Sequence, residues 1–330
     1  MPNKIGIGEK ILVTNLKIIG EINGTDLRFI REMAGSDVKG NSTSGNLSVL
    51  DLSEAKFVAG GDYYYKDYED GCYTSNDIIG KYAFRDCKSL TSVIIPSSVT
   101  EIREYAFDGC ISLKNVNIPS SVTEIGCGAF GGCSSLTSVN IPSSVTKIEG
   151  GTFYFCTSLT SVNIPSSVTS IGTRAFWCCW FLASVKIPSS VTEIECGAFS
   201  GCHSLTSVNI PSSVTSIGKY AFFYCSGLKS IYVYAETVPS IGAGAFNGFD
   251  SENCTLYVPK GTYDVYRYSW GGIFENIVEF DATNIRNIVA EPEVQENARY
   301  AVNGRRLIAP VKGINLVKYN NGRVKKEIVK

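Results

Sequence analysis

The chain has a single histidine among 330 residues, and its 30 basic and 31 acidic residues give a formal net charge of −1. Because balanced charges create no overall positive field, we expect no nucleic-acid partner and no anionic membrane partner. No stretch reaches the roughly 20 consecutive apolar residues of a membrane-spanning helix. The N-terminal segment lacks the basic head and apolar stretch of a signal peptide. We therefore expect either a cytosolic protein or a mature form without its leader.

Motifs of the common catalytic chemistries are also missing. The chain has no glycine-rich phosphate loop, no H-E-x-x-H pair, no EF-hand loop and no G-x-S-x-G turn. Cys202 and His203 are adjacent and could form a nucleophile–base pair, but neighbouring side chains in one turn tend to diverge. We predict no catalytic residue, no cofactor and no metal site, and keep an enzyme that uses Cys202 and His203 as an alternative.

What the chain has instead is a repeat of 23 residues. The eleven residues VNIPSSVTSIG occur twice, at 162–172 and 208–218, which lie two periods apart. Phenylalanine, proline and cysteine each recur at this interval, so chance is excluded. The positions are Phe84, Phe107, Phe130, Phe153, Phe176, Phe199 and Phe222; Pro96, Pro119, Pro142, Pro165, Pro188 and Pro211; and Cys87, Cys110, Cys133, Cys156, Cys179, Cys202 and Cys225.

The spacing of apolar residues within one unit predicts two short strands. The segment 138–142 (SVNIP) alternates polar and apolar residues, which is typical of a strand with one buried face. Pro142 can donate no ladder hydrogen bond and should end it. A second extended piece should follow with Val145 and Ile148 inward. The A-F-x-x-C stretch shows no alternation, and we expect a helical turn that carries the phenylalanine into the core.

A single unit is too small to fold alone. Burial of its apolar side chains contributes roughly 10 to 20 kcal/mol, whereas ordering its residues costs roughly 1 to 2 kcal/mol each. Stacked units cover one another's apolar faces and pair their backbones. The sequence therefore predicts a solenoid.

The strings SLTSVNIPSSVTSIG and AFxxC, with this period, resemble the BspA-like class of leucine-rich repeats, known from surface proteins of host-associated bacteria and some protists. The resemblance covers residues 78–280. It implies a right-handed, mostly β solenoid of the α/β leucine-rich-repeat type with caps at both ends. It also implies secretion to the extracellular space or cell surface.

We divide the chain into six segments. Residues 1–46 are expected to form an N-terminal cap with an amphipathic helix at 25–35, and 47–77 a divergent first repeat with a strand at 47–55 and a tyrosine-rich loop. The tail is expected to form a small β-meander; it also resembles the last strands of type IX sorting domains, and a sorting role is the alternative. The remaining boundaries are 78–230 for regular repeats, 231–280 for degenerate repeats and a C-terminal cap, 281–298 for a linker and 299–330 for the meander.

The seven repeated cysteines are interpreted as small buried core residues. Stacked in register, their side chains should point in parallel, whereas zinc needs converging thiolates and a disulfide needs facing Cβ atoms. The sequence does not pair the other five, Cys72, Cys127, Cys178, Cys196 and Cys254.

Two surfaces are candidate binding sites. The first, the amide row, follows exposed strand positions beside a row of serines; its asparagines could bind a ligand or hydrogen-bond one another. The second, the aromatic edge, departs from the repeat consensus and is either a partner site or a local packing repair. Stacking should place Tyr154 beside Trp177. The amide row is Asn117, Asn140, Asn163 and Asn209, and the aromatic edge is Tyr154, Phe155, Trp177, Trp180 and Phe181.

These features predict a non-enzymatic, extracellular or cell-surface binding protein that recognises protein ligands in adhesion, with a glycan as the alternative ligand. A structural spacer or self-associating element without a specific ligand is the second interpretation. The residues leave the ligand and the oligomeric state open.

Overall fold

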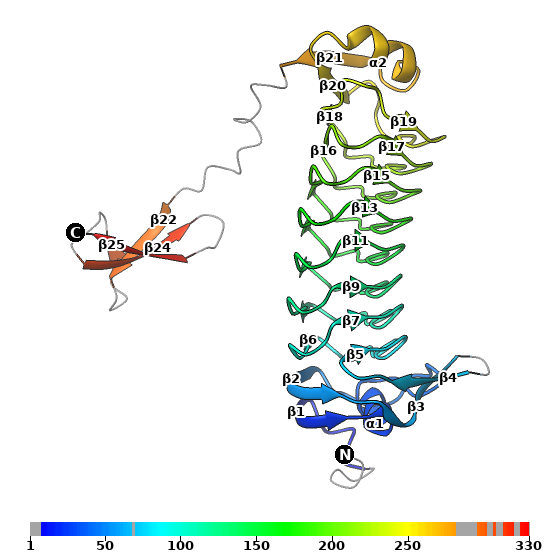
Figure 1. Cartoon of the computed structure of the whole chain (residues 1–330), viewed down its shortest axis with the longest axis vertical. Coiled ribbons are helices and arrows are strands. Elements are labelled where there is room, and N and C mark those ends of the chain that lie inside the picture. Colours follow the sequence, from blue (N-terminus) through cyan, green and yellow to red (C-terminus); the bar gives the residue numbers. More distant parts are fainter. Residues whose placement is uncertain are drawn as a thin grey trace. The chain divides into compact units, whose positions relative to one another are not determined.

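The computed structural model describes residues 8–67 and 70–281, together with the backbone of four strands within 296–329. The chain separates into two compact units between Phe280 and Asp281. The first unit is an elongated stack of coils, with the chain advancing by one coil per repeat (Figure 1). The predicted linker over 281–298 lies mostly outside the described residues.

The N-terminal elements are two parallel strands joined through a helix. β1 (Asn15–Ile22) pairs with β2 (Val49–Phe57), and α1 (Gly24–Met33) lies between them in the chain. Asn23 and Asp26 form a capping box, in which each side chain accepts a hydrogen bond from the other's backbone N–H. The helix expected at 25–35 and the strand expected at 47–55 are confirmed. The assignment of residues 1–46 as a cap stays a prediction.

A buried arginine joins α1 to the first regular coil. The guanidinium of Arg31 donates to the carbonyls of Tyr82 at 2.8 Å and Ala83 at 3.1 Å, and also to the hydroxyl of Ser36 and the carbonyl of Asp37. These acceptors offset the desolvation of a fully buried charge.

The tyrosine-rich segment forms a hairpin of β3 (Gly60–Asp67) and β4 (Asp70–Thr74). Tyr64 and Tyr65 are buried against the core, whereas the ring of Tyr73 is 58% exposed. The segment expected as a tyrosine-rich loop is therefore a hairpin that packs some of its rings and exposes others.

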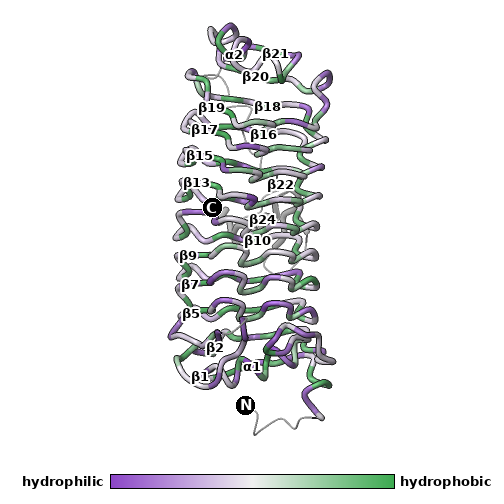
Figure 2. Tube along the Cα trace, turned by 90° about the vertical axis from the view of Figure 1, so that its right-hand side faces the viewer, coloured by the Kyte–Doolittle hydropathy of each residue, from purple (hydrophilic) through white to green (hydrophobic). Residues whose placement is uncertain are grey.

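Two sides of each coil are short parallel strands, and most of them pair with the strand one repeat further on, for example Val139 with Val162. In the described chain this pairing is interrupted once on each side, between residues 115–117 and 138–140 on the first and between 124–125 and 147–148 on the second. Hydrophobic and hydrophilic segments recur at equivalent places from coil to coil (Figure 2). The first side contains β1, β2, β6 (Ser92–Ile94), β8 (Asn115–Asn117), β10 (Ser138–Asn140), β12 (Ser161–Asn163), β14 (Ser184–Lys186), β16 (Ser207–Ile210), β18 (Ser230–Val233), β20 (Thr255–Pro259) and β21 (Asn276–Phe280). The second contains β5 (Ile78–Ile79), β7 (Glu101–Ile102), β9 (Glu124–Ile125), β11 (Lys147–Ile148), β13 (Ser170–Ile171), β15 (Glu193–Ile194), β17 (Ser216–Ile217) and β19 (Ser240–Ile241).

The third side, where a helical turn was expected, is built from two successive turns instead. Within a coil, N–H groups donate to carbonyls three residues back, as from Gly131 to Gly128. Alternate N–H groups donate to the next coil, as from Phe130 to Thr152 at 2.9 Å. Between residues 34 and 262 the described part of the chain contains no helix. A helix would direct all of its N–H groups along its own axis, so this side could not join the coils.

Each double turn contains two residues with positive φ, one on each side of the core phenylalanine. The residue two positions before the phenylalanine is glycine in some coils and tyrosine or arginine in others, as at Gly151 and Arg174. The second is glycine in four coils and a larger residue in four others, including Phe155 at φ 53°. Glycine adopts this left-handed conformation without strain, whereas bulky residues rarely do.

The core contains a continuous column of phenylalanine rings. Neighbouring rings from Phe84 to Phe246 are stacked with centroids 5.1 to 5.8 Å apart. The strand residues Val139 and Ile141, and Val145 and Ile148 on the second side, are buried as their spacing predicts.

The repeated cysteines are buried but do more than occupy space. From Cys110 to Cys225, each Sγ donates to the carbonyl of the phenylalanine 26 residues earlier, at 3.1 to 3.3 Å. The thiols therefore link consecutive coils. All twelve cysteines are free.

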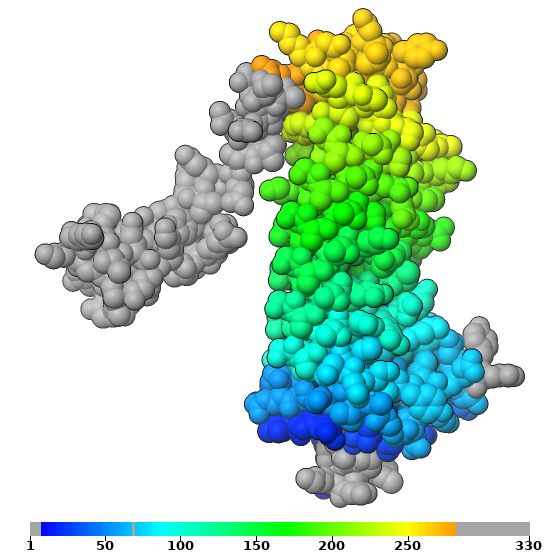
Figure 3. All heavy atoms as spheres, in the orientation of Figure 1, coloured from blue at the N-terminus to red at the C-terminus, as the bar shows by residue number. Residues whose placement is uncertain are grey.

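The last coils close on α2 (Tyr263–Trp270), which lies between β20 and β21 in the chain. Tyr266 and Trp270 are buried, and the hydroxyl of Tyr266 donates to the carbonyl of Ala235 at 2.7 Å. The space-filling view shows these last residues in orange and yellow at one end of the stack (Figure 3). Their role as a C-terminal cap stays a prediction.

The second unit is a four-stranded antiparallel sheet of β22 (Glu296–Ala301), β23 (Arg306–Leu307), β24 (Gly313–Tyr319) and β25 (Val324–Val329). The alternation in the tail thus correctly predicts strands. The order is β23-β22-β24-β25, so β24 pairs with β22 and not with β23 as in a plain meander.

Removing one ring from the phenylalanine column should be costly. We expect Phe153→Ala to lower the free energy of unfolding by about 3 to 5 kcal/mol, because the fully buried ring leaves a cavity between two stacked neighbours. The exposed ring of Phe181 is the matched control, and Phe181→Ala should change stability by less than about 0.5 kcal/mol. Urea denaturation followed by circular dichroism measures both values. Similar losses in the two variants would contradict the column's role.

Candidate binding surfaces

The aromatic edge lies on the third side, at and just after the two positions that follow the core phenylalanine. Coils differ strongly here: one carries Gly131 and Gly132, the next Tyr154 and Phe155, and the next Trp177 with Cys178. The second position of each pair has positive φ, at 53° for Phe155 and 57° for Cys178. The backbone of this side therefore stays constant while its side chains change.

Tyr154 is held by packing and by a buried carboxylate. A Cβ atom on Gly131 would lie 1.9 Å from the Tyr154 ring, so the ring occupies space that only glycine leaves free. Its hydroxyl donates to Asp108 Oδ1 at 2.6 Å, and Arg85 lies 3.2 Å from the other oxygen of Asp108. The packing interpretation of the aromatic edge therefore describes Tyr154 well.

Tyr154 and Trp177 lie in adjacent coils as expected, but no ring contact between them is found in the described residues, because Tyr154 folds back over Gly131. Phe155 instead packs edge-on against Trp177 with centroids 4.8 Å apart, and Tyr154 contacts Phe155 at 6.0 Å. The guanidinium of Arg174 lies 5.3 Å from the Trp177 ring centroid, a cation–π distance.

Tyr154 and Trp177 nevertheless line one shared groove of about 270 Å³. Tyr105 forms a third aromatic wall, and the glycines of two coils line it as well. Tyr105 and Arg174 are not among the site residues predicted from the sequence. The glycines facing them were a usable signal, since glycine in two adjacent coils leaves room between larger neighbours. The lining residues are Tyr105, Gly128, Gly150, Gly151, Tyr154, Thr173, Arg174 and Trp177.

Trp180 and Phe181 are separate from this groove. Cys179 precedes them and is buried, and the chain then turns outward, leaving the side chains 44% and 60% exposed. No ring contact joins either residue to Trp177 among the described residues. The aromatic edge is thus a packed groove beside two exposed anchors.

The amide row is in register from Asn140 onward but is interrupted by a lysine, and Asn117 lies in β8, which pairs with β6 and belongs to a different sheet from β10. Asn140 pairs with Asn163, which pairs with Lys186, which pairs with Asn209. No hydrogen bond joins the side chains of the four asparagines in the described part of the chain, so the expected stacking bonds are not found. Beyond Asn209 the same row continues as Tyr232 and Tyr257, stacked at 4.4 Å.

The Cys202–His203 pair is not arranged for nucleophilic catalysis. The Cys202 thiol is fully buried and donates to the carbonyl of Phe176, and burial raises its pKa well above the usual range. His203 is exposed, with Nδ1 3.4 Å from the hydroxyl of Ser226. The two side chains diverge, as expected for neighbours in one turn.

The described residues contain neither a candidate metal-binding cluster nor a helix that could span a membrane. No cluster of three or more His, Cys, Asp or Glu side chains there could hold a metal ion. Neither helix in the described part has the length and apolar character required to cross a membrane.

The sequence matches the family model of the BspA type leucine rich repeat region in six copies, over residues 77–206 and 192–290. The chain belongs to the BspA-type leucine-rich repeat family. This membership confirms the resemblance seen in the repeats and agrees with the parallel β-solenoid. Repeats of this family suggest a role in protein interaction and typically form a non-enzymatic scaffold. No curated protein matches the chain.

Several solved structures are similar to this BspA-type chain. A leucine-rich repeat protein from Bacteroides ovatus is 24% identical, covering 65% of this chain and 67% of its own, with a TM-score of 0.44. The leucine rich repeat protein of T. pallidum is 31% identical, covering 58% and 75%, with a TM-score of 0.41. A leucine rich cell surface protein from Faecalibacterium prausnitzii is 23% identical, covering 71% and 80%, with a TM-score of 0.38.

The hydroxyl of Tyr154 should stabilise the protein in a pH-dependent way. Burial raises the pKa of Asp108, and the bond from Tyr154 and the charge of Arg85 oppose that rise. A carboxyl with a raised folded-state pKa makes stability fall as the pH rises through that pKa. Tyr154→Phe raises the pKa further, so we expect a loss of about 1.5 to 3 kcal/mol at about pH 8 and a smaller loss at about pH 4.

Thermal and urea unfolding at both pH values measures this loss. Tyr268→Phe on α2 is the control, because that side chain is 93% exposed. An equal loss at both pH values would show that the Asp108 carboxylate is not the partner that matters.

Thiol reactivity should separate the cysteines by burial. Iodoacetamide should label the exposed Cys127 and Cys196 of the native protein and leave Cys202 unmodified, because thiolates react and burial both raises the Cys202 pKa and blocks access. Peptide mass spectrometry reads the labelling, with urea-unfolded protein as the control in which all sites react. Fast, selective labelling of Cys202 would restore the enzyme hypothesis.

Proposed function

We propose that this protein is a secreted or cell-surface binding protein that recognises a protein ligand through its aromatic edge. The proposal rests on the backbone conformation of the residue two positions after the core phenylalanine. Phe155 has φ 53° and Tyr224 has φ 54°, at positions where other coils carry Gly109, Gly132 and Gly201. The fold does not require a side chain there, and a bulky one is strained.

The side chains at this edge are those that dominate protein interfaces. Trp180 and Phe181 are exposed anchors, and Trp177 is supported by Phe155 and by Arg174. Buried tryptophan, aromatic and arginine side chains supply most of the energy of a typical interface. The rigid stack holds them in place, so little conformational freedom is lost on binding.

Two other interpretations make different predictions for this edge. A glycan ligand would use the same rings as stacking platforms. A structural spacer would use neither the rings nor the groove, and replacing them would change only stability or self-association.

The test begins with arrays of extracellular-matrix proteins, cell-surface proteins and glycans, and any protein that binds the full chain is then titrated by calorimetry. We expect the double variant Trp177→Ser, Trp180→Ser to weaken binding more than about tenfold, equivalent to about 1.4 kcal/mol. Tyr268→Ser is the control, since Tyr268 is exposed on α2, away from the edge.

The possible outcomes distinguish a protein-binding edge, a glycan-binding edge and a structural spacer. Unchanged affinity in the double variant would refute the aromatic edge as the binding site. Binding of glycans alone would replace the protein ligand by a carbohydrate. An absence of any ligand, together with self-association, would favour the spacer.

A further inference from the structure

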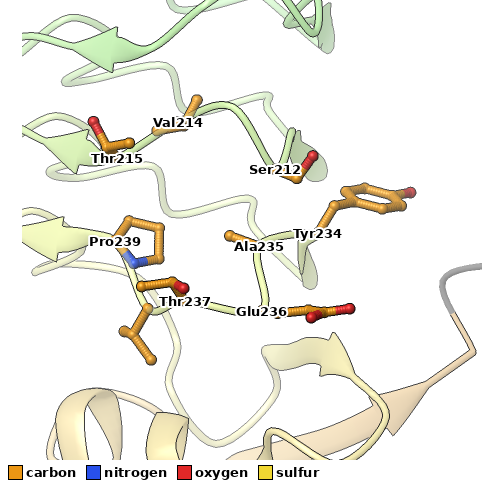
Figure 4. A pocket seen from close by; sticks show the side chains of 9 residues that line it. Ser212, Val214, Thr215, Tyr234, Ala235, Glu236, Thr237 and Pro239 are labelled. Atoms are coloured by element: carbon orange, nitrogen blue, oxygen red, sulfur yellow. The ribbon is translucent and has the colours of Figure 1, made fainter.

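One coil contains an extra residue, and a cavity lies beside it. Ile210 pairs with Val233 and Ser216 pairs with Ser240, so five residues (211–215) face six (234–239) between the two sheets. A cavity of about 440 Å³ opens between these segments (Figure 4). Its lining residues are Ser212, Val214, Thr215, Tyr234, Ala235, Glu236, Thr237, Val238 and Pro239.

Beside the cavity, a series of hydrogen bonds that joins the regular coils comes to an end. In five consecutive coils a serine hydroxyl donates to a valine carbonyl of the preceding coil, the last being Ser213 to Val191 at 2.6 Å. The carbonyl of Val214 is the next in this series and has no such donor among the described residues. Val214 is only 1% exposed, so its carbonyl marks where the series breaks and is not itself a ligand contact.

The irregular segment also lacks the usual backbone bonds. The turn bond that Val214 makes to Pro211 has no counterpart at Val238, and the carbonyl of Ala235 accepts from Tyr266 instead. Pro239 stands where other coils have threonine and has no N–H, so Ser240 donates to Thr215 in its place. In the described chain, no backbone bond from the N–H groups of residues 235–238 is found, and all four residues line the cavity.

The side chains around the cavity combine an aromatic ring with hydroxyls and one carboxylate. Ser212, Tyr234 and Glu236 point to one side of the opening, and Thr215 and Pro239 lie at the other (Figure 4). Phe280 packs edge-on to Tyr234 at 5.4 Å, which fixes that ring. The lining contains no Lys, Arg or His.

We infer that this cavity is a binding subsite for a neutral sugar unit of an oligosaccharide. A pyranose has an apolar C–H face that suits the Tyr234 ring, and its hydroxyls both donate and accept. They match the exposed side chains of Ser212, Glu236 and Thr237 and the unbonded N–H groups of residues 236 and 237. The carboxylate and the lack of a cation disfavour sulfated or acidic sugars. A concave site with few converging polar groups is typical of small-molecule binding.

This subsite is independent of the aromatic edge. It is formed by the segments that connect the first sheet side to the second, and it uses none of the edge residues. A protein ligand at the edge and a sugar in this cavity are therefore compatible, and each can fail without the other.

The test uses the full chain and a panel of neutral gluco-, manno- and galacto-oligosaccharides, with heparin fragments as an anionic comparison. Saturation-transfer NMR screens for binding and calorimetry gives Kd. Ser212→Trp should fill the cavity and weaken binding of the best neutral oligosaccharide at least about tenfold. Ser189→Trp is the matched control, since Ser189 is the equivalent exposed residue of the preceding regular coil.

Two substitutions that add no bulk test the same cavity if the tryptophan disturbs the loop. Tyr234→Ala removes the ring, and Glu236→Gln keeps the size and removes the charge; both should weaken binding while the unfolding midpoint stays within a few degrees. The inference is overturned if no neutral oligosaccharide binds at millimolar concentration. It is also overturned if heparin fragments bind best, or if binding survives Ser212→Trp and Tyr234→Ala together.

Discussion

Backbone hydrogen bonding between coils, at a fixed offset of one repeat, is the constraint on which the rest of this structure depends. Two sides satisfy it through parallel strand pairing and the third through alternate N–H groups of the double turn. Because every coil must present the same groups to its neighbours, the same residue types recur at the same positions. The phenylalanine column and the thiol bonds to phenylalanine carbonyls follow from that register. The identical strings in the sequence are its visible result.

The sequence predicts the sheet sides well because their signals are local. The alternation in SVNIP and the position of Pro142 are sufficient to place the strand and its end, and Val145 and Ile148 to place the inward residues of the second side. The third side could not be predicted in the same way. Its backbone is set by bonds to other coils, and residues such as Tyr105 and Arg174 adopt positive φ there with no propensity for it. Short-range pattern therefore favoured a helical turn that long-range bonding excludes.

Contacts between coils also limit how much of the candidate site the sequence could predict. The sequence could identify where coils differ, and so found the aromatic residues of 154–155, Trp177 and the pair at 180–181. It could not foresee that Tyr154 would fold over Gly131 toward Asp108, because that contact joins residues two repeats apart. Nor could it foresee the cavity at 234–239, which arises from one additional residue and from bonds that are not made. Both features are properties of pairs of coils and are not visible in a single repeat.

The left-handed position after each core phenylalanine has a wider meaning. The residue there is glycine in some coils, as at Gly132 and Gly201, and carries a large ring in others, as at Phe155 and Tyr224. The backbone follows the same path in both cases. Such a position uncouples the identity of the side chain from the construction of the scaffold. A large group in one coil restricts the next, since a Cβ atom at Gly248 would lie 3.1 Å from the ring of Tyr224 and one at Gly109 2.7 Å from Asp86 Oδ1. The solenoid thus carries a row of positions that can display a side chain, in which a displayed group in one coil favours glycine in the next.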